Sequence, residues 1–310
     1  MIDLLTPAFV TAFIIACLAG AIPLLLASVG ETVGEQSGVL NLGIEGVMLV
    51  GAYFGYVVAL DTGSTWLGMF GGAVAGAVIS LVMLVLNVWL GLNQIVLGIA
   101  VTLAGSGITS VLYDQLYANT APRVALDHWR IPGLSQVPVV GTSIFSQPGM
   151  FWVCLLIAGV VAWSLAKTNW GLSIRAAGQK PSSLDTAGGS VMRTRSEAVL
   201  VGGVLAGLGG AYLSVLATSA FTPFMTNGLG YIAIVVTMLA RGRILRVVIV
   251  SLLYGLTVAV GTVLQLTSLN IPTDLITMLP YIVVMVVLLL FGRGASNAPV
   301  LGAPYTRGAR

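Results

Sequence analysis

Long apolar stretches with almost no charge are the feature that most constrains how this chain can fold. Only 7% of its 310 residues are charged and 57% are hydrophobic, whereas an ordinary soluble domain carries about 25% charged residues. So few charges could not cover this much apolar surface in water, so we expect most side chains to face lipid or one another within a bilayer. At about 20 residues per span, this length accommodates roughly eight to ten transmembrane helices.

Breaks at polar, glycine and proline residues divide the apolar sequence into nine candidate spans. The third is long enough to be tilted, and the seventh is short. We predict an all-α polytopic membrane protein with about nine transmembrane helices over residues 1–292 and a disordered C-terminal tail over residues 293–310. The spans are predicted at 7–29, 39–60, 65–90, 94–113, 149–167, 197–218, 228–240, 245–267 and 272–292.

The basic residues predict the orientation, because short cytoplasmic loops carry an excess of Lys and Arg. With nine spans, the loop between spans five and six, the loop between seven and eight and the C-terminal tail fall on one side. Eleven of the thirteen basic residues lie there. We therefore predict the N-terminus outside, the C-terminus inside, a periplasmic loop over 114–148 and a cytoplasmic loop over 168–196.

Spans one to four and six to nine form two four-helix halves around span five, and the halves run in opposite directions. In each half the second helix follows a glycine-rich stretch, Gly30 to Gly46 in the first and Ser219 to Gly230 in the second. Inverted repeats with interrupted helices at matching positions are a transporter design, and the interruptions mark the solute path. The sequence therefore predicts two inverted halves flanking a central helix.

The stretch from Gly30 to Gly46 carries the most unusual polar residues. Asn41 and Glu45 are four residues apart, so in a helix they would lie on one face. A carboxylate within the bilayer costs roughly 3 kcal/mol and is a functional hypothesis by default. Two interpretations of Glu45 remain open: it contacts the solute, or it has a structural role, either capping a neighbouring helix or lying at the headgroup level and fixing the entry of the second span. For Glu31 and Glu35 we predict a solvated loop.

Uncharged polar side chains complete a candidate solute path, since spans with so few charges suit a neutral, polar solute. Tyr53 or Phe54 could stack on a base, but core packing is the favoured interpretation for both. The candidate solute-contacting residues are Asn41, Glu45, Asn87, Asn93, Gln94 and Asn227.

A short helix is predicted within the cytoplasmic loop 168–196. Pro181 suits its first position and Gly188 its C-terminal stop. A short amphipathic helix lying parallel to the membrane is a shape that a soluble partner could bind. The alternative interpretation is an ordinary solvated connection.

Three stretches resemble the binding-protein-dependent ABC permeases of the simple-sugar and nucleoside branch, and the match looks closest to the shorter permease of nucleoside importers. The first is GEQSGVLNLGIEGVMLVGAY, from Gly34 to Tyr53. The second is TNWGLSIRAAGQKP, followed by AVLVGGVLAGLGGAYLS from Ala198 to Ser214. The third is GLGYIAIVVTMLARGR, from Gly228 to Arg243.

The resemblance implies an importer subunit in the inner membrane that translocates a small polar solute, foremost a nucleoside, by alternating access. A simple sugar, riboflavin or a similar receptor-delivered solute is the alternative. The implied partners are an ABC ATPase subunit, a second permease subunit in a heterodimer, and a periplasmic or lipoprotein solute-binding receptor.

The resemblance also implies that the segment from Arg175 to Gly189 contains the coupling helix that docks on the ATPase. Related chains often have Asn-Pro followed by Ala-rich residues there, whereas this chain reads Lys180-Pro181-Ser182-Ser183-Leu184-Asp185. The departure puts partner specificity in doubt. The implied coupling residues are Arg175, Gly178, Pro181, Ser183, Asp185, Ala187 and Gly188.

Several motifs are absent from the sequence. It contains no Gly-Lys dipeptide and hence no GxxxxGK[ST] phosphate loop, so ATP must be hydrolysed by another chain. The single histidine, His128, falls in the predicted outer loop, so we predict no metal site, no cofactor and no nucleic-acid partner. An ion-coupled carrier would need several buried carboxylates, and one good candidate is visible. An intramembrane enzyme would need a nucleophile, base or metal set within the spans, and none is visible.

Overall fold

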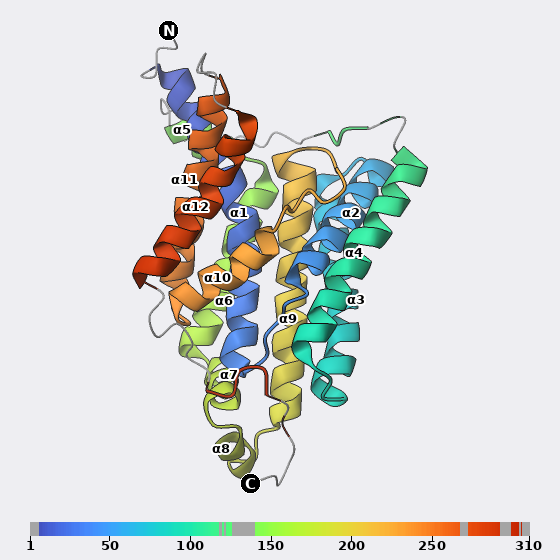
Figure 1. Ribbon diagram of the computed structural model, residues 1–310, viewed down its shortest axis with the longest axis vertical. Coiled ribbons are helices and arrows are strands. Elements are labelled where there is room, and N and C mark those ends of the chain that lie inside the picture. The colour runs from blue at the N-terminus through green and yellow to red at the C-terminus, as the bar shows by residue number, and fades with distance from the viewer. Residues whose placement is uncertain are drawn as a thin grey trace.

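A computed structural model describes residues 6–117, 120, 122–125, 140–266, 272–291, 299–303 and 305. Within these ranges all regular structure is helical (Figure 1). Eight described helices are long and apolar enough to cross a membrane, and a further apolar helix spans only 12 residues. The all-α fold and the order of the nine predicted spans are thereby confirmed.

The helices follow the predicted spans closely, apart from the end of the first and the start of the sixth. Two long helices, α3 and α9, end in wider π-helical segments, Leu84–Trp89 and Tyr212–Ala217. The long helices are α1 (Pro7–Ser37), α2 (Ile44–Thr62), α3 (Thr65–Met83), α4 (Gln94–Tyr117), α6 (Gly149–Lys167), α9 (Val191–Ala211), α10 (Leu229–Ala240), α11 (Ile244–Leu266) and α12 (Thr273–Phe291). The short helices are α5 (Val140–Ile144), α7 (Asn169–Gln179) and α8 (Pro181–Thr186).

Helix α1 is eight residues longer than the first predicted span, which ended at residue 29. Glu31 and Glu35 are 2% and 4% exposed within it, so their predicted position in a solvated loop is wrong. Gly30 does not break the helix but allows close packing: a Cβ built there would lie 2.8 Å from the carbonyl oxygen of Gly202 on α9. The irregular part of the predicted stretch is therefore only the linker 38–43, and α1 ends at Gly38, whose φ is +87°.

The contacts between helices follow an inverted repeat. Helix α1 packs against α9, α10 and α11, while α9 packs against α1, α2 and α3. This is the pattern expected when α1–α4 and α9–α12 are equivalent halves related by an in-plane axis, with α6 between them in the chain. Figure 1 shows α1 and α9 side by side at the centre of the molecule.

Burial separates central from peripheral spans. In α2 and α9, 72% and 78% of the most apolar window is buried inside the protein, against 22% in α4 and 17% in α12. Because lipid is as apolar as leucine, peripheral spans can expose large apolar side chains without cost. Helices α4 and α12 therefore supply lipid-facing surface, and α2 and α9 supply the core.

Two interrupted helices begin partway along the bundle rather than at its ends. Figure 1 shows the linker 38–43 rising from the lower end of α1 to the start of α2, while the segment 218–228 descends from the upper end of α9 to the start of α10. The predicted irregular stretches thus exist at matching places in the two halves.

Some sequence expectations fall outside the described residues. They include His128 and Arg130 of the predicted outer loop and most of the tail 293–310. The orientation, and the assignment of the loops to the two sides of the membrane, stay predictions.

Candidate functional site

The carboxylate of Glu45 joins the starts of the two interrupted helices. Glu45 lies in the first turn of α2 and is 6% exposed. Its Oε1 accepts hydrogen bonds from the Thr226 hydroxyl at 2.6 Å and the Gly228 backbone N–H at 2.8 Å, and its Oε2 accepts one from the Gly230 N–H at 2.6 Å. The side chain therefore caps α10, as one of the two sequence interpretations held.

The physical chemistry of this cap is favourable. Backbone N–H groups at the start of a helix have no partner within the helix, and the helix dipole places partial positive charge there. Within the hydrocarbon region no water can satisfy them. One buried carboxylate of the first half thus satisfies the start of the interrupted helix of the second half.

The cap depends on a close approach of the two backbones. A Cβ built on Gly230 would lie 2.6 Å from both the backbone nitrogen and the Cα of Glu45. A larger residue at position 230 would push α10 away from α2 and lengthen the bonds to the carboxylate. Glycine at this position is consequently a packing requirement.

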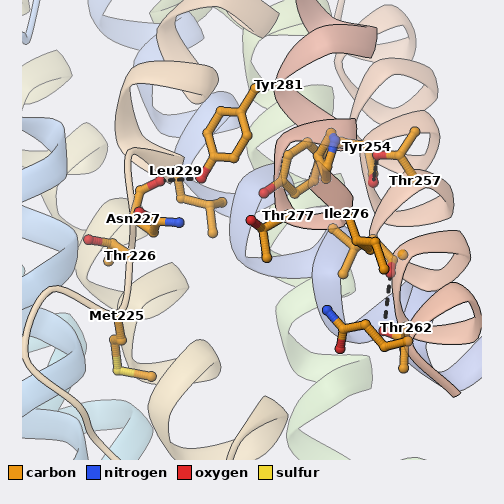
Figure 2. Close-up of a pocket in the computed structure, with 14 residues that line it drawn as sticks. Met225, Thr226, Asn227, Leu229, Tyr254, Thr257, Thr262, Ile276, Thr277 and Tyr281 are labelled. Carbon is orange, nitrogen blue, oxygen red and sulfur yellow. Dashed lines mark hydrogen bonds between the residues drawn. The ribbon is translucent and has the colours of Figure 1, made fainter. Parts of the chain in front are cut away.

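A cavity of about 250 Å³ lies next to the capped start of α10, between that start and helices α11 and α12 (Figure 2). None of the residues that line it carries a charge. Figure 2 shows the ring of Tyr281 beside Asn227, with its hydroxyl directed towards that residue, and the ring of Tyr254 farther from Asn227. The lining residues are Met225, Thr226, Asn227, Leu229, Tyr254, Thr257, Val258, Gly261, Thr262, Gln265, Ile276, Thr277, Pro280 and Tyr281.

Asn227 is the one predicted solute-contacting residue that lines this cavity. Its backbone carbonyl accepts a hydrogen bond from the Tyr281 hydroxyl at 2.5 Å. Its side-chain amide is exposed at the cavity and also interacts with the Tyr281 hydroxyl. Its φ of +44° is in the left-handed region, where asparagine is tolerated better than most residues.

Three other predicted residues hold the linker 38–43 and the start of α4. The Asn41 side chain accepts a hydrogen bond from Gly43 N–H at 3.0 Å, and the Gln94 side chain accepts one from Leu40 N–H at 2.8 Å. The expectation that Asn41 and Glu45 share a helix face is wrong, because Asn41 precedes α2.

Asn93 is exposed and caps α4, accepting bonds from the N–H groups of Ile95 at 2.9 Å and Val96 at 3.3 Å. A solute role for Asn41, Asn93 and Gln94 stays a prediction.

Glu31 also supports the linker. Its Oε1 accepts a hydrogen bond from Asn41 N–H at 3.1 Å. Because backbone N–H groups inside a bilayer need protein partners, a buried carboxylate at this place has a structural reason that the sequence pattern did not reveal. Glu31 thus supports the start of α2 much as Glu45 supports the start of α10.

Most of the cavity lining was missed at the level of sequence. Threonine and tyrosine in an apolar span are not distinguishable from lipid-facing or core residues by pattern alone. One signal was available: Tyr254, Thr257 and Gly261 recur at helical spacing on a single face of α11, opposite the exposed apolar Leu252 and Leu256. By contrast, the expected core packing of Tyr53 is confirmed, since it is 2% exposed, whereas that of Phe54 is wrong, since it is 40% exposed.

The predicted coupling segment folds into α7 and α8. Pro181 opens α8, and Gly188, with a φ of +86°, follows its end, so both sequence predictions of the helix boundaries are confirmed. Leu184 is the buried residue of α8 and packs with Ala177 and Val191. Ser183 and Ala187 are exposed, so the short helix has one face fixed to the protein and one face open.

The remaining predicted coupling residues are spread around that helix. Gly178 is buried, and a Cβ at its position would clash with the backbone of Gln36 at the end of α1. Arg175 and Asp185 are partly exposed. Gly178, which packs against the end of α1, is thus only a few residues before α8 and its exposed face.

The described part of the C-terminal tail is folded rather than disordered, which corrects the sequence expectation for residues 299–303 and 305. Gly302 N–H donates to the Gly38 carbonyl at 3.0 Å, and Tyr305 packs beside Leu184. Arg195, only 3% exposed, donates to the carbonyl oxygens of Ser37 at 3.2 Å and Ala303 at 2.8 Å. The tail therefore connects α8 to the end of α1.

Two interrupted helices, an uncharged cavity beside them and a short helix exposed at one end define a multi-pass membrane permease. The model of the family described as branched-chain amino acid transport system / permease component matches residues 13–289, so the chain belongs to that family.

Curated relatives agree with this assignment. The chain is 36% identical over 268 residues to a putative glucose ABC transporter permease protein of Haloferax volcanii, covering 86% of this chain and 81% of the relative. It is 31% identical to the nucleoside ABC transporter permease protein NupC of Lactococcus lactis, over 89% of this chain and 90% of that one. It is 30% identical to the guanosine ABC transporter permease protein NupQ of Bacillus subtilis, over 95% and 96%.

No solved structure matches the chain. The chain is an ABC transporter permease of the nucleoside and sugar type, and it is a multi-pass protein of the cell membrane. Permease subunits of this kind are not themselves enzymes.

Proposed function

We propose that the cavity beside the start of α10 binds the transported solute and that this solute is a neutral, polar molecule, foremost a nucleoside. The observation that carries the proposal is the lining, which contains amides, hydroxyls and tyrosine rings but no charge. A charged solute would leave water without a counter-ion, at a cost that polar groups alone do not offset. A neutral solute avoids that cost.

The lining suits a molecule with a flat ring and several hydroxyls. The exposed amide of Asn227 has both a donor and an acceptor group, as the edge of a nucleobase or a sugar hydroxyl requires. The two tyrosine rings offer aromatic surface on which a base could stack. At about 250 Å³ the cavity lies near the low end of the roughly 300–1,000 Å³ of ligand pockets, which favours a small solute.

A simple sugar is the second candidate, because one of the relatives is named a glucose permease. Sugar hydroxyls would use the same amides and threonines but would gain less from the tyrosines. The two solutes are therefore separated by the ring contacts of Tyr254 and Tyr281.

The proposed assembly contains three further components. An ABC ATPase supplies the energy and docks on the open face of α8, a solute-binding receptor delivers solute at the opposite end, and a second permease subunit completes the pathway as a heterodimer. Alternating access then moves α10 and its capped start relative to α11 and α12, opening the cavity to each side in turn.

The test uses cells that express the complete transporter and measures uptake of labelled adenosine and labelled glucose. Asn227→Gly removes the amide and keeps the left-handed backbone accessible, and we expect uptake to fall about five- to ten-fold, as the loss of one or two hydrogen bonds would give. Ser219→Gly is the matched control, since Ser219 also has a positive φ, +54°, but does not line the cavity.

Uptake by the Asn227→Gly protein equal to that of the wild type would rule out this cavity as the solute site. Adenosine uptake that glucose suppresses completely, and that is unchanged by Tyr254→Leu, would favour the sugar. A matched loss in the Ser219→Gly control would assign the effect to loop flexibility instead.

A further inference from the structure

A second cleft lies between the same three helices at their other ends. It has a volume of about 520 Å³ and shares no residue with the solute cavity. Whereas the solute cavity lies where α10 and α12 begin, this cleft lies where both helices end. Its lining consists of Leu239, Arg241, Arg246, Ile249, Val250, Leu253, Val287 and Phe291.

Two arginines stand at this apolar cleft with no acidic residue in the lining. Arg241 donates to the carbonyl oxygen of Phe291 at the end of α12, at 3.3 Å. Arg246 is half-buried, and its guanidinium makes no hydrogen bond or ion pair with the described part of the chain. A guanidinium that is partly removed from water and lacks an internal partner is stabilised by an external anion, and phosphate oxygens match its planar donors.

An apolar face of α10 extends from the cleft towards the start of that helix, and we call this face, together with the facing residues of α12, the groove. Tyr231, Val235 and Leu239 are spaced four residues apart and so lie on one face of that helix. Leu239 lines the cleft, while Tyr231 and Val235 line a neighbouring cavity of about 300 Å³ whose opposite wall includes Val284 and Met285 of α12. The helix rises about 12 Å from Tyr231 to Leu239, close to the roughly 15 Å hydrocarbon depth of one leaflet.

The surroundings are lipid-facing. Ile249 and Phe291 at the rim of the cleft are 58% and 65% exposed, and Leu245 beside it is 73% exposed. The basic residues of the loop between α10 and α11 are also among those that predict the cytoplasmic side of the membrane. An occupant of the cleft would therefore enter from the leaflet on that side.

We propose that this cleft is a binding site for one anionic phospholipid. Its phosphate lies at Arg246 and Arg241, and one acyl chain follows the groove between α10 and α12. Basic pockets between transmembrane helices on the cytoplasmic side have the chemistry that such headgroups require. A free phosphate would not fill the groove, and the choline of a zwitterionic lipid would offset the attraction of the two guanidinium groups.

The site has a consequence for transport. The bound lipid would contact the ends of α10 and α12, whose beginnings form the solute cavity. Anionic lipid would thus hold together two helices that alternating access must move.

Native mass spectrometry of the complete transporter provides the test. The complex is reconstituted in nanodiscs of phosphatidylcholine containing a minor fraction of phosphatidylglycerol, released, and examined for lipid that stays bound. We expect one retained phosphatidylglycerol in the wild type and about five-fold lower occupancy in Arg246→Gln, the effect of one basic residue worth about 1 kcal/mol.

The matched control is Arg243→Gln, which removes the same charge from an exposed residue three positions earlier, in the loop before α11, that does not line the cleft. It should retain the lipid as the wild type does. Val250→Phe narrows the cleft without changing charge and should also lower occupancy. The Val250→Phe variant retains both arginines, so it still tests the proposal if the Arg246→Gln protein fails to fold.

Three results would overturn the proposal. Equal losses in Arg243→Gln and Arg246→Gln would indicate diffuse surface charge rather than a site. Equal retention of phosphatidylcholine and phosphatidylglycerol would remove the headgroup selectivity. Displacement of the lipid by inorganic phosphate, together with unchanged occupancy in Val250→Phe, would assign the arginines to a free anion.

Discussion

At the scale of single residues, Glu45 is the polar side chain of the described core that joins the starts of the two interrupted helices. It accepts three hydrogen bonds from the segment before α10 and from its first turn. Thr226, one of the donors, also lines the solute cavity. Glu45 is therefore a positioning residue: it does not line the cavity, but it holds in place Thr226 and the start of α10, which do.

Substituting this carboxylate tests that role. In Glu45→Gln one oxygen is replaced by an NH₂ group that cannot accept a bond, so a buried N–H or hydroxyl loses its partner. We expect a loss of stability of about 2 kcal/mol, typical of hydrogen bonds to charged groups, and a clear fall in solute uptake. Thermal unfolding in detergent and uptake in cells measure the two effects.

The control for this substitution is Glu197→Gln. Glu197 is partly exposed and pairs with Arg193 on the surface at 3.1 Å, and such pairs contribute about 1 kcal/mol or less. It also accepts a bond from the Trp170 indole N–H at 3.1 Å, which the remaining oxygen of a glutamine can still accept. If Glu45→Gln behaved like this control in both measurements, the cap would not be what holds α10 in place.

At the scale of elements, the sequence predicted the positions of the helices better than it predicted where some of them end and what those ends contact. The bounds of α6 match the prediction because Pro148 and Thr168 mark its ends clearly. The end of α1 was misplaced because glycine breaks helices in water but packs them closely in membranes, as Gly30 does against Gly202. That distinction depends on the neighbouring helix and cannot be read from one segment.

The candidate site was predictable to a similar degree. The interrupted helices pointed to the start of α10, beside which the cavity lies, and Asn227 and the capping interpretation of Glu45 came from the residues themselves. The tyrosines and threonines of α11 and α12 did not, because an isolated hydroxyl in an apolar span has the same pattern on a lipid face as in a cavity. Only the folded arrangement of α10 against these helices separates the two.

The short helix α8 yields a prediction at this scale. Leu184 fixes the inner face of α8, and both Asp185 of α8 and Arg175 of the preceding helix α7 are partly exposed, so they can be changed without removing that core contact. We expect Arg175→Ala and Asp185→Ala to lower uptake about ten-fold or more, as the loss of an interface anchor would, while ATP hydrolysis by the complex continues. Uptake and ATPase rate are measured on the same membranes.

A matched variant separates coupling from general damage to α8. Ser182→Ala alters an exposed residue of the same helix that is outside the predicted coupling set, and it should leave both rates near those of the wild type. Normal uptake in Arg175→Ala and Asp185→Ala would remove the coupling role from both residues.

At the scale of the whole molecule, the tail joins the proposed ATPase-docking surface to the solute pathway. Tyr305 contacts the core beneath α8, and Gly302 donates to Gly38, where α1 ends and the linker 38–43 begins. That linker leads directly to α2 and to Glu45 in its first turn. A displacement of α8 therefore has a continuous packed route to the point where the two inverted halves meet.

Arg195 links the tail to the end of α1, and for this reason we expect deletion of the tail to affect stability and transport. A guanidinium that is 3% exposed depends on its acceptors, which are the carbonyl oxygens of Ser37 and Ala303. Deleting residues 299–310 removes the second acceptor, and a buried donor left without a partner costs about 1–3 kcal/mol. We expect a lower unfolding temperature and reduced uptake per ATP hydrolysed, because α8 and the end of α1 are no longer joined.

The shorter deletion of residues 306–310 is the internal control. It removes Arg307 and Arg310 but keeps Ala303 and Tyr305, so coupling should stay near that of the wild type. Arg195→Gln should reproduce part of the long deletion, since it also breaks the bond to Ala303, and in addition it breaks the bond to Ser37. If the long and short deletions have the same effect, or if the long one leaves the ratio of uptake to hydrolysis unchanged, the route from α8 to α2 does not pass through the tail.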